Sequence, residues 1–186
     1  MIYPIAAYGL PVLKKRAKAI NKDYPGLEQL ISDMYDTMYF SQGVGLAAPQ
    51  INLSIRLFVT DGTPFRNEEP GLENFKKVFI NPEIITEEGD EWKFNEGCLS
   101  IPGIREDVER KPLLHLKYFD ENFEPHDEYF SGIAARIIQH EYDHIEGILF
   151  VDHLSSFKKR LLKGKLNDIS AGIVDVDYKM KFAVKK

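Results

Sequence analysis

One segment constrains this chain more than any other: IIQHEYDH (137–144) places two histidines four residues apart, with a glutamate directly after the first. Apolar residues recur before it at helical spacing and a glycine follows, so we predict a helix over 133–146. Residues i and i+4 of a helix share one face. His140 and His144 can therefore bind one metal ion, and the fold must then bring further ligands to that face.

The bulk composition is that of an ordinary globular protein. The chain has 186 residues, of which 44% are hydrophobic and 28% charged, and it can bury a core as one domain over 1–186. A net charge of -5 argues against a general nucleic-acid binder, which is normally basic. With a single cysteine, no disulfide can form within the chain. We see neither a signal peptide nor a membrane span, so we expect the cytoplasm.

The first half of the chain alternates helix and strand patterns. Apolar residues at helical spacing predict a helix over 26–40. Strands are predicted over 55–61 and 77–85, and the polar segment 61–75, rich in turn formers, reads as a long surface loop. The pair Gly89-Asp90 predicts a hairpin after the second of these strands.

The second half begins with an antiparallel meander. Alternating residues over 113–120 and a strand over 126–130 flank a turn. A basic and apolar stretch over 154–169 predicts another helix, and the alternating tail after about 170 could add a strand. The order of elements predicts an α+β fold, with antiparallel β-sheets packed around the long metal-binding helix, an N-terminal helix, and a C-terminal helix and extended tail.

Glu141 suits a catalytic metal site. It is rotated about 100° from His140 around the helix, so its carboxylate lies beside the ion, where it can move the protons of activated water. Such a site needs a third protein ligand and one open position. The other histidines are poor candidates, because we read His115 as solvated, His126 as part of a polar turn, and His153 as capping or exposed.

Cys98 is the best third ligand. A lone cysteine is usually a small buried hydrophobe, but this thiol in NEGCLSIPG would complete a three-ligand set with the two imidazoles. Three readings stay open on these residues: a catalytic metal site, a metal that only stabilises the fold, and a helix with two unrelated histidines.

GVGLAAPQ (43–50) follows the first helix and taken alone reads as a simple helix-to-strand connection. In the order GVGLAAPQ, EGCLS, QHEYDH, however, the three segments resemble the signature motifs of the peptide deformylases, over about Tyr8 to Asp152. The resemblance implies a metal-dependent hydrolase that removes the formyl group from the N-terminal formyl-methionine of new bacterial polypeptides.

The resemblance also implies a role for each matching residue. The metal ligands would be Cys98, His140 and His144, with Glu141 as the carboxylate that acts as general base and acid. The Gln50 side chain and the Leu99 backbone N–H would hold the formyl oxygen. The native ion in this family is typically Fe²⁺, and Zn²⁺, Ni²⁺ or Co²⁺ can occupy the same site; a thiolate ligand does not decide among them.

Substrate contacts are implied around these residues. The methionine side chain would lie in an apolar pocket near Val44, Ile137 and His140, with Ile133 as a further lining residue. The backbone of an extended peptide would pair with Gly43, Gly45 and Gly97, and Arg105 also matches a family position. Glu96 would organise the cysteine loop, and Arg110 would contact Asp143 behind the metal ligands.

The chain departs from the common family pattern in two places. The loop at about 62–75 is longer than in compact members, and the part after about Ile169 alternates instead of continuing a helix. Some family members dock on the ribosome through a C-terminal helix. A transient ribosome contact is therefore a further expectation, although a solvated helix face explains the same charges, which are Lys158, Lys159, Arg160, Lys163 and Lys165.

The sequence leaves two rivals to the deformylase hypothesis. A zinc peptidase of the general HExxH kind would share the helix but take its third ligand downstream, so Cys98→Ala would leave its metal bound. A non-catalytic module with a structural metal needs a fourth protein ligand, and Glu141→Ala would leave its properties intact.

Overall fold

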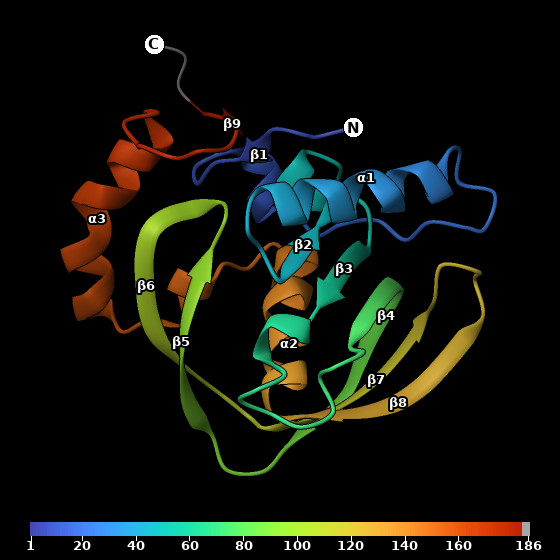
Figure 1. Ribbon diagram of the computed structural model, residues 1–186. Coiled ribbons are helices and arrows are strands. Elements are labelled where there is room, and N and C mark those ends of the chain that lie inside the picture. Colours follow the sequence, from blue (N-terminus) through green and yellow to red (C-terminus); the bar gives the residue numbers. More distant parts are fainter. Residues whose placement is uncertain (184–186) are drawn as a thin grey trace.

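A central helix organises the molecule. The computed structural model describes residues 1–183. In Figure 1, α2 (Gly132–Glu146) runs through the middle, with one antiparallel sheet on each side and α1 (Leu27–Phe40) across one end. Ile137, Ile138 and Ile145 of α2 are at most 6% exposed, and each such buried side chain stabilises the fold by about 1.5–3 kcal/mol. The α+β prediction, with antiparallel sheets around this helix, is confirmed.

The larger sheet lies on one side of α2 and has five antiparallel strands in the order β2-β3-β4-β7-β8. The predicted meander of 113–120 and 126–130 is present as β7 and β8, because alternate residues of β7 (Leu114, Leu116 and Tyr118) are buried against the core. The strands are β2 (Gly45–Ala47), β3 (Leu57–Asp61), β4 (Lys76–Glu88), β7 (Leu113–Phe119) and β8 (Pro125–Ser131).

The smaller sheet corrects one prediction. β5 (Trp92–Cys98) pairs with β6 (Ile101–Arg110), a strand that the sequence analysis missed, and not with β4. The chain does turn at Gly89, where φ is +88°, but the predicted hairpin is wrong. The half of β4 next to this turn is paired with β7 instead. A glycine turn indicates a reversal, whereas long-range contacts select the strand that pairs.

The three helices match their predicted ranges. α1 buries the stripe Leu27, Leu30, Ile31, Met34 and Met38. α2 ends at Gly147, whose φ of +79° is the left-handed conformation that glycine adopts easily. α3 (Ser156–Ser170) begins after Ser155, whose side chain accepts a hydrogen bond from the Lys158 N–H. Short 3-10 helices connect the larger elements: η1 (Pro11–Lys14), η2 (Ala48–Ile51), η3 (Thr63–Phe65) and η4 (Phe150–His153).

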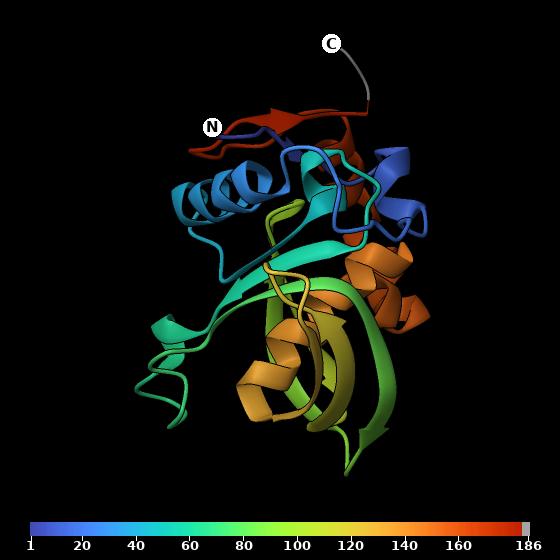
Figure 2. The same cartoon turned by 90° about the vertical axis from the view of Figure 1, so that its right-hand side faces the viewer.

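The segment 62–75 projects from one side of the molecule (Figure 2), but it is not wholly a surface loop. Leu72 and Phe75 are buried, and the Glu69 carboxylate accepts a hydrogen bond from the Ile133 N–H over 2.9 Å. An anion is favourable at the start of a helix. The loop therefore docks on the beginning of α2.

The two ends of the described chain meet. β9 (Met180–Lys181) pairs in parallel with β1 (Ile5–Ala6), and Figure 1 shows them side by side. The predicted strand in the tail is therefore present, but it is only two residues long, and residue 184 of the alternating stretch lies outside the described residues. Among residues 1–183, no helix combines the length and the apolar character that crossing a membrane requires.

Candidate metal centre

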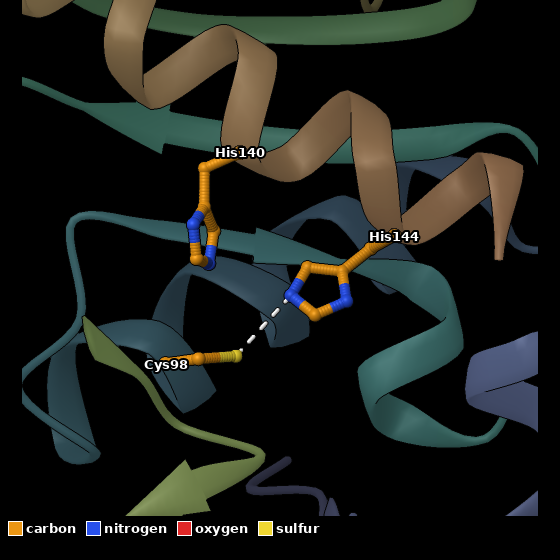
Figure 3. Close-up of side chains that lie close together, drawn as sticks. All are labelled: Cys98, His140 and His144. Atoms are coloured by element: carbon orange, nitrogen blue, oxygen red, sulfur yellow. Dashed lines mark hydrogen bonds between the residues drawn. The ribbon is translucent and has the colours of Figure 1, made fainter. Parts of the chain in front are cut away.

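Three side chains from two elements point at one place. His140 and His144 project from α2, and Cys98 from the end of β5 (Figure 3). Their ligand atoms all lie within 4.8 Å of one another, and Cys98 Sγ is 3.3 Å from His144 Nε2. The structure thus brings together the three residues that the sequence analysis chose as ligands.

This donor set fits a divalent transition metal. Burial alone would raise the pKa of the Cys98 thiol, but His144 and His140 outweigh it and lower the pKa to about 5, so the sulfur is an anion ready to bind a cation. One thiolate and two imidazoles suit iron and zinc alike. Within the described chain the cluster has three members, whereas closed structural zinc sites have four. An ion held by these three residues would keep one position open for water or substrate.

The Glu96 carboxylate orients one ligand from behind. Glu96 is 4% exposed, and its Oε2 accepts a hydrogen bond from His140 Nδ1 over 2.9 Å, which directs Nε2 toward the site. Arg110 and Arg136 hold the same carboxylate with N–O distances of 2.8–3.0 Å. Burial would raise the pKa of Glu96, but His140 and Arg110 hold it far below its usual range. Glu96 is therefore a buried anion that fixes the His140 ring.

The network continues to the surface. Arg110 Nη1 donates to Asp143 Oδ2 over 2.7 Å, so the contact predicted between these residues is present. The same oxygen lies 2.7 Å from His153 Nε2. His153 is thus engaged with a carboxylate outside the ligand cluster.

Glu141 lies beside the ligands and is buried from solvent. It is 4% exposed, and its buried Oε2 has no hydrogen-bond partner among residues 1–183. Burial raises the pKa of Glu141 to about 7, although His140 and His144 oppose the shift. Gly45 makes room for it, because a Cβ on Gly45 would lie 2.4 Å from Glu141 Oε1. A carboxylate with this pKa can both accept and donate a proton near neutral pH.

Gln50 presents its amide nitrogen to the site. The side chain is 1% exposed, and its Oε1 accepts a hydrogen bond from the Ala47 N–H over 2.8 Å. This contact turns Nε2 toward Cys98 Sγ at 3.5 Å and Ser100 Oγ at 3.4 Å. Across the described residues, no turn or loop hydrogen bond uses the Leu99 N–H. Two donors are thus available next to the ligand cluster.

A cavity of about 410 Å³ opens onto this site. Most of the predicted substrate contacts line it: Gly43, Val44, Gly45, Gly97, Arg105 and Ile137. Ile133 does not, because it is buried in the core between α2 and the larger sheet, and its predicted place on the pocket wall is not supported. Eight further lining residues were not predicted from the sequence: Gln42, Phe65, Phe94, Asn95, Ile101, Gly103, Ile104 and Arg136.

Two of these missed residues form one wall. The rings of Phe65 and Phe94 meet edge-on at 6.3 Å. Phe65 lies in the segment interpreted as a surface loop, and only its aromatic character in a polar stretch could have signalled a buried role. Arg136 could not be predicted for another reason. Its hydrogen-bond partners come from β5 and β6, and the sequence around Arg136 does not indicate them.

The two histidines of the meander lie apart from the cluster, on β7 and β8. His126 Nε2 pairs with Asp120 over 2.9 Å, in the polar turn region expected for it. His115 was predicted to be solvated, but its side chain is only 16% exposed, stacked on Tyr129 and paired with Asp127. Cross-strand stacking covers a ring that the alternation pattern places on the outer face.

Comparisons with known proteins identify the family of this chain. A family model described as polypeptide deformylase matches residues 2–160. The chain is 60% identical to the peptide deformylase of Christiangramia forsetii, with 98% of this chain and 96% of the relative covered. It is 56% identical to that of Cytophaga hutchinsonii over the full length of both.

Solved structures show the same fold. A crystal structure of a peptide deformylase from Legionella pneumophila is 38% identical and superposes with a TM-score of 0.78, covering 90% of this chain and 95% of that one. The peptide deformylase from Thermotoga maritima is 41% identical with a TM-score of 0.75, covering 83% and 99%. This chain belongs to the polypeptide deformylase family of enzymes.

Proposed function

We propose that this enzyme removes the formyl group from N-terminal formyl-methionine of nascent polypeptides, in the cytoplasm where such chains are made. One observation carries the proposal: Cys98, His140 and His144 converge next to Glu141, in contact with a cavity that has apolar walls. A ligand set for a metal, a proton carrier and a side-chain pocket are what hydrolysis of a formyl-methionyl amide requires.

The methionine side chain would enter the apolar part of the cavity. Val44 and Ile137 line it together with Phe65 and Phe94. A thioether is flexible and packs well against aromatic rings. The backbone around Gly43, Gly45 and Gly97 lines the same cavity, so an extended peptide can pair with it as with a sheet edge. Arg105, which is exposed and donates a hydrogen bond to Asn95, would contact the peptide residues that follow the methionine.

The formyl oxygen gains negative charge as its carbon is attacked. Gln50 Nε2 and the Leu99 N–H are the donors available to it, and Gln50 is held in place by Ala47. Because both donors are positioned before the reaction, little reorganisation is needed, and a donor of this kind is typically worth about 2.7–4 kcal/mol in the transition state.

Glu141 would move the proton. Its unpartnered Oε2 can accept a proton from water and pass it to the departing amine. Cys98, His140 and His144 would hold the ion, with His140 kept in orientation by Glu96. When bound, a divalent ion supplies Lewis acidity, which activates water and polarises the carbonyl. We propose Fe²⁺ as the native ion, as the family resemblance implies. Zn²⁺, Ni²⁺ and Co²⁺ would be substitutes, because one thiolate and two imidazoles accept all four ions.

The direct test is formate release from formyl-Met-Ala by protein purified without oxygen, with the bound metal measured on the same sample. We expect about one metal ion per chain and steady formate release. A fully metallated protein that releases no formate would rule the proposed function out. Incubation with unformylated Met-Ala-Ser distinguishes a deformylase from a zinc peptidase, because a peptidase would cleave this peptide and a deformylase would not.

We further propose that α3 makes a transient contact with the ribosome. The support is an exposed face with Phe157 at 67% and Leu161 at 66% exposure beside the exposed cations Arg160, Lys163 and Lys165. The other two cations of the helix are engaged within the chain, Lys158 with Glu106 and Lys159 with the Asp152 carbonyl.

Sedimentation with ribosomes tests this contact. Reversing the charge of Arg160 and Lys163 together should abolish co-sedimentation at low salt, because binding to RNA phosphates depends on such cations. The matched control reverses Lys15 and Lys22, which are exposed at the other end of the chain. Equal binding by both double variants would contradict a contact through α3.

A further inference from the structure

The C-terminal tail returns from α3 to the N-terminal strand. Ile5 and Ala7 donate their N–H groups to the carbonyls of Lys179 and Lys181, both over 2.8 Å. These bonds make the parallel pair β1–β9, which Figure 1 places at one end of the molecule. Met180 also packs against two of the core clusters. The tail is thus bound to the rest of the fold through backbone and side chain.

From this position the tail reaches the turn that follows Cys98. The Tyr178 hydroxyl donates a hydrogen bond to the Leu99 carbonyl over 2.8 Å. The next carbonyl of the same turn, that of Ser100, accepts the Tyr8 N–H, also over 2.8 Å. Leu99 and Ser100 are the two residues that join β5 to β6. Both carbonyls of this turn are therefore held by the two paired ends of the chain.

Tyr178 is suited to be a permanent donor. Its ring packs against the core cluster that Leu99 also contacts. Burial, with a contribution from the negative charge of Cys98, raises the pKa of Tyr178 to about 12, so the hydroxyl stays protonated across the physiological range. A carbonyl can only accept, so the hydroxyl hydrogen is committed to Leu99.

We propose that Tyr178 is a positioning residue for deformylation, which holds Leu99 so that its N–H faces the formyl oxygen. The inference rests on the proposed function above. The N–H and the carbonyl of Leu99 belong to the two peptide planes that meet at its Cα. Because each peptide is planar, a fixed second plane also fixes the Leu99 Cα that the two planes share, and the first plane can then turn only through the φ and ψ of Leu99. Tyr178 lies beyond residues 2–160, the part that the family model matches, so this contact comes from the chain's own C-terminal segment.

The expected effect of losing this contact is kinetic. Tyr178→Phe keeps the ring and its packing and removes only the hydroxyl. The turn then loses one of its two anchors, and the Leu99 N–H is less well placed when charge develops on the formyl oxygen. Loss of one such donor lowers kcat by about 10²–10³-fold, so partial misplacement should lower kcat by roughly tenfold. KM for formyl-Met-Ala should change by less than about twofold, because Tyr178 is not among the cavity-lining residues.

Tyr35→Phe is the matched control. Its hydroxyl also donates to a backbone carbonyl, that of Lys77, over 3.0 Å, and its ring packs against the same core cluster. The two variants lose the same kind of bond, but the Tyr35 hydroxyl bonds to β4 and not to the turn after Cys98. We expect Tyr35→Phe to keep the wild-type kcat in the metal-loaded enzyme, with metal content unchanged in both variants.

A second measurement needs no substrate. In the zinc-loaded protein, which is diamagnetic, the NMR order parameter of the Leu99 amide should fall in Tyr178→Phe and stay at the wild-type value in Tyr35→Phe. The inference is overturned if kcat and the Leu99 order parameter are both unchanged in Tyr178→Phe, if the two variants lose kcat equally, or if only KM changes.

These results are distinguishable from a failure of the proposed function. A metallated wild-type enzyme that releases no formate would end the proposed function, and the order parameter would still decide whether Tyr178 holds Leu99. If the wild-type enzyme is active but the two variants have the same kcat and the same Leu99 order parameter, only the positioning role of Tyr178 is refuted.

Discussion

Glu96 holds His140 through a hydrogen bond of 2.9 Å between its Oε2 and the ring Nδ1. The carboxylate is in turn held by Arg110 and Arg136, so three cationic or hydrogen-donating side chains meet on one buried anion. A ligand that is oriented by a fixed carboxylate presents its other nitrogen in one direction only. The Glu96 network therefore fixes the orientation of one ligand on this face of α2.

Replacing this carboxylate should weaken both metal binding and the fold. Glu96→Gln removes the carboxylate partner of buried Arg136 and one of the two carboxylate partners of Arg110, which costs about 3–5 kcal/mol in the free energy of unfolding. Metal affinity should fall by about 10- to 100-fold. Chelator competition and urea unfolding measure the two effects. Glu109→Gln, which removes only an exposed partner of Lys93, should change neither; a Glu96→Gln protein with wild-type metal affinity would refute the orienting role.

Gly45 should tolerate no side chain. A Cβ there would lie 2.4 Å from Glu141 Oε1 and 2.7 Å from Cδ, so Gly45→Ala must displace the carboxylate. A displacement of about 1 Å can cost 10²-fold in rate, and we expect kcat to fall by about that factor with metal still bound. Gly164→Ala is the control, because nothing lies within 4 Å of its Cβ and alanine favours a helix. Equal kcat values for the two variants would contradict the contact.

Phe65 should contribute to the affinity of the pocket for the methionine side chain. Phe65→Ala removes one of the two rings that meet at 6.3 Å in its wall. KM for formyl-Met-Ala should rise by roughly tenfold with kcat nearly unchanged, because the lost contact is made equally before and during the reaction. Phe157→Ala, on the exposed face of α3, is the control. A fall in kcat at constant KM would show that the ring acts on the chemistry instead.

Removing the metal should leave a reactive thiolate. With the pKa of Cys98 at about 5, the thiolate dominates above that pH and is lost only below it. Alkylation of the metal-free protein by iodoacetamide should therefore be nearly constant from about pH 6 to 8, whereas an ordinary thiol reacts about tenfold faster per pH unit over this range. A rate that rises tenfold per unit would mean that the two histidines do not stabilise the anion.

The histidine pair was predictable because its pattern is local, and Cys98 because the chain has no other thiol. His140 and His144 lie one helical turn apart. The three helices were predictable for the same reason, since their apolar stripes repeat within a few residues. The contacts that orient the site were not, because Tyr178 and Leu99 are 79 residues apart and only the folded chain brings them together.

Strand pairing shows the same limit. The turn at Gly89 was identified, but β5 joins β6 because that strand offers it a partner, and no signal near Gly89 reveals this. The positions of Phe65 and Arg136 on the cavity wall also depend on residues that are distant in the sequence. Phe65 was therefore interpreted as part of a surface loop, and the burial of Arg136 was not predicted. Ile133 was assigned to the pocket with the residues that the family resemblance implies, whereas in the structure it is buried in the core.

The central claim is that Cys98, His140 and His144 hold an ion beside which Glu141 carries the proton. Metal content and formate release, measured together on wild type and Glu141→Gln purified without oxygen, test it most directly. The account predicts one bound metal in both proteins and a loss of about 10²–10⁴-fold in formate release for the variant. A Glu141→Gln enzyme that keeps its metal and releases formate at the wild-type rate would contradict it.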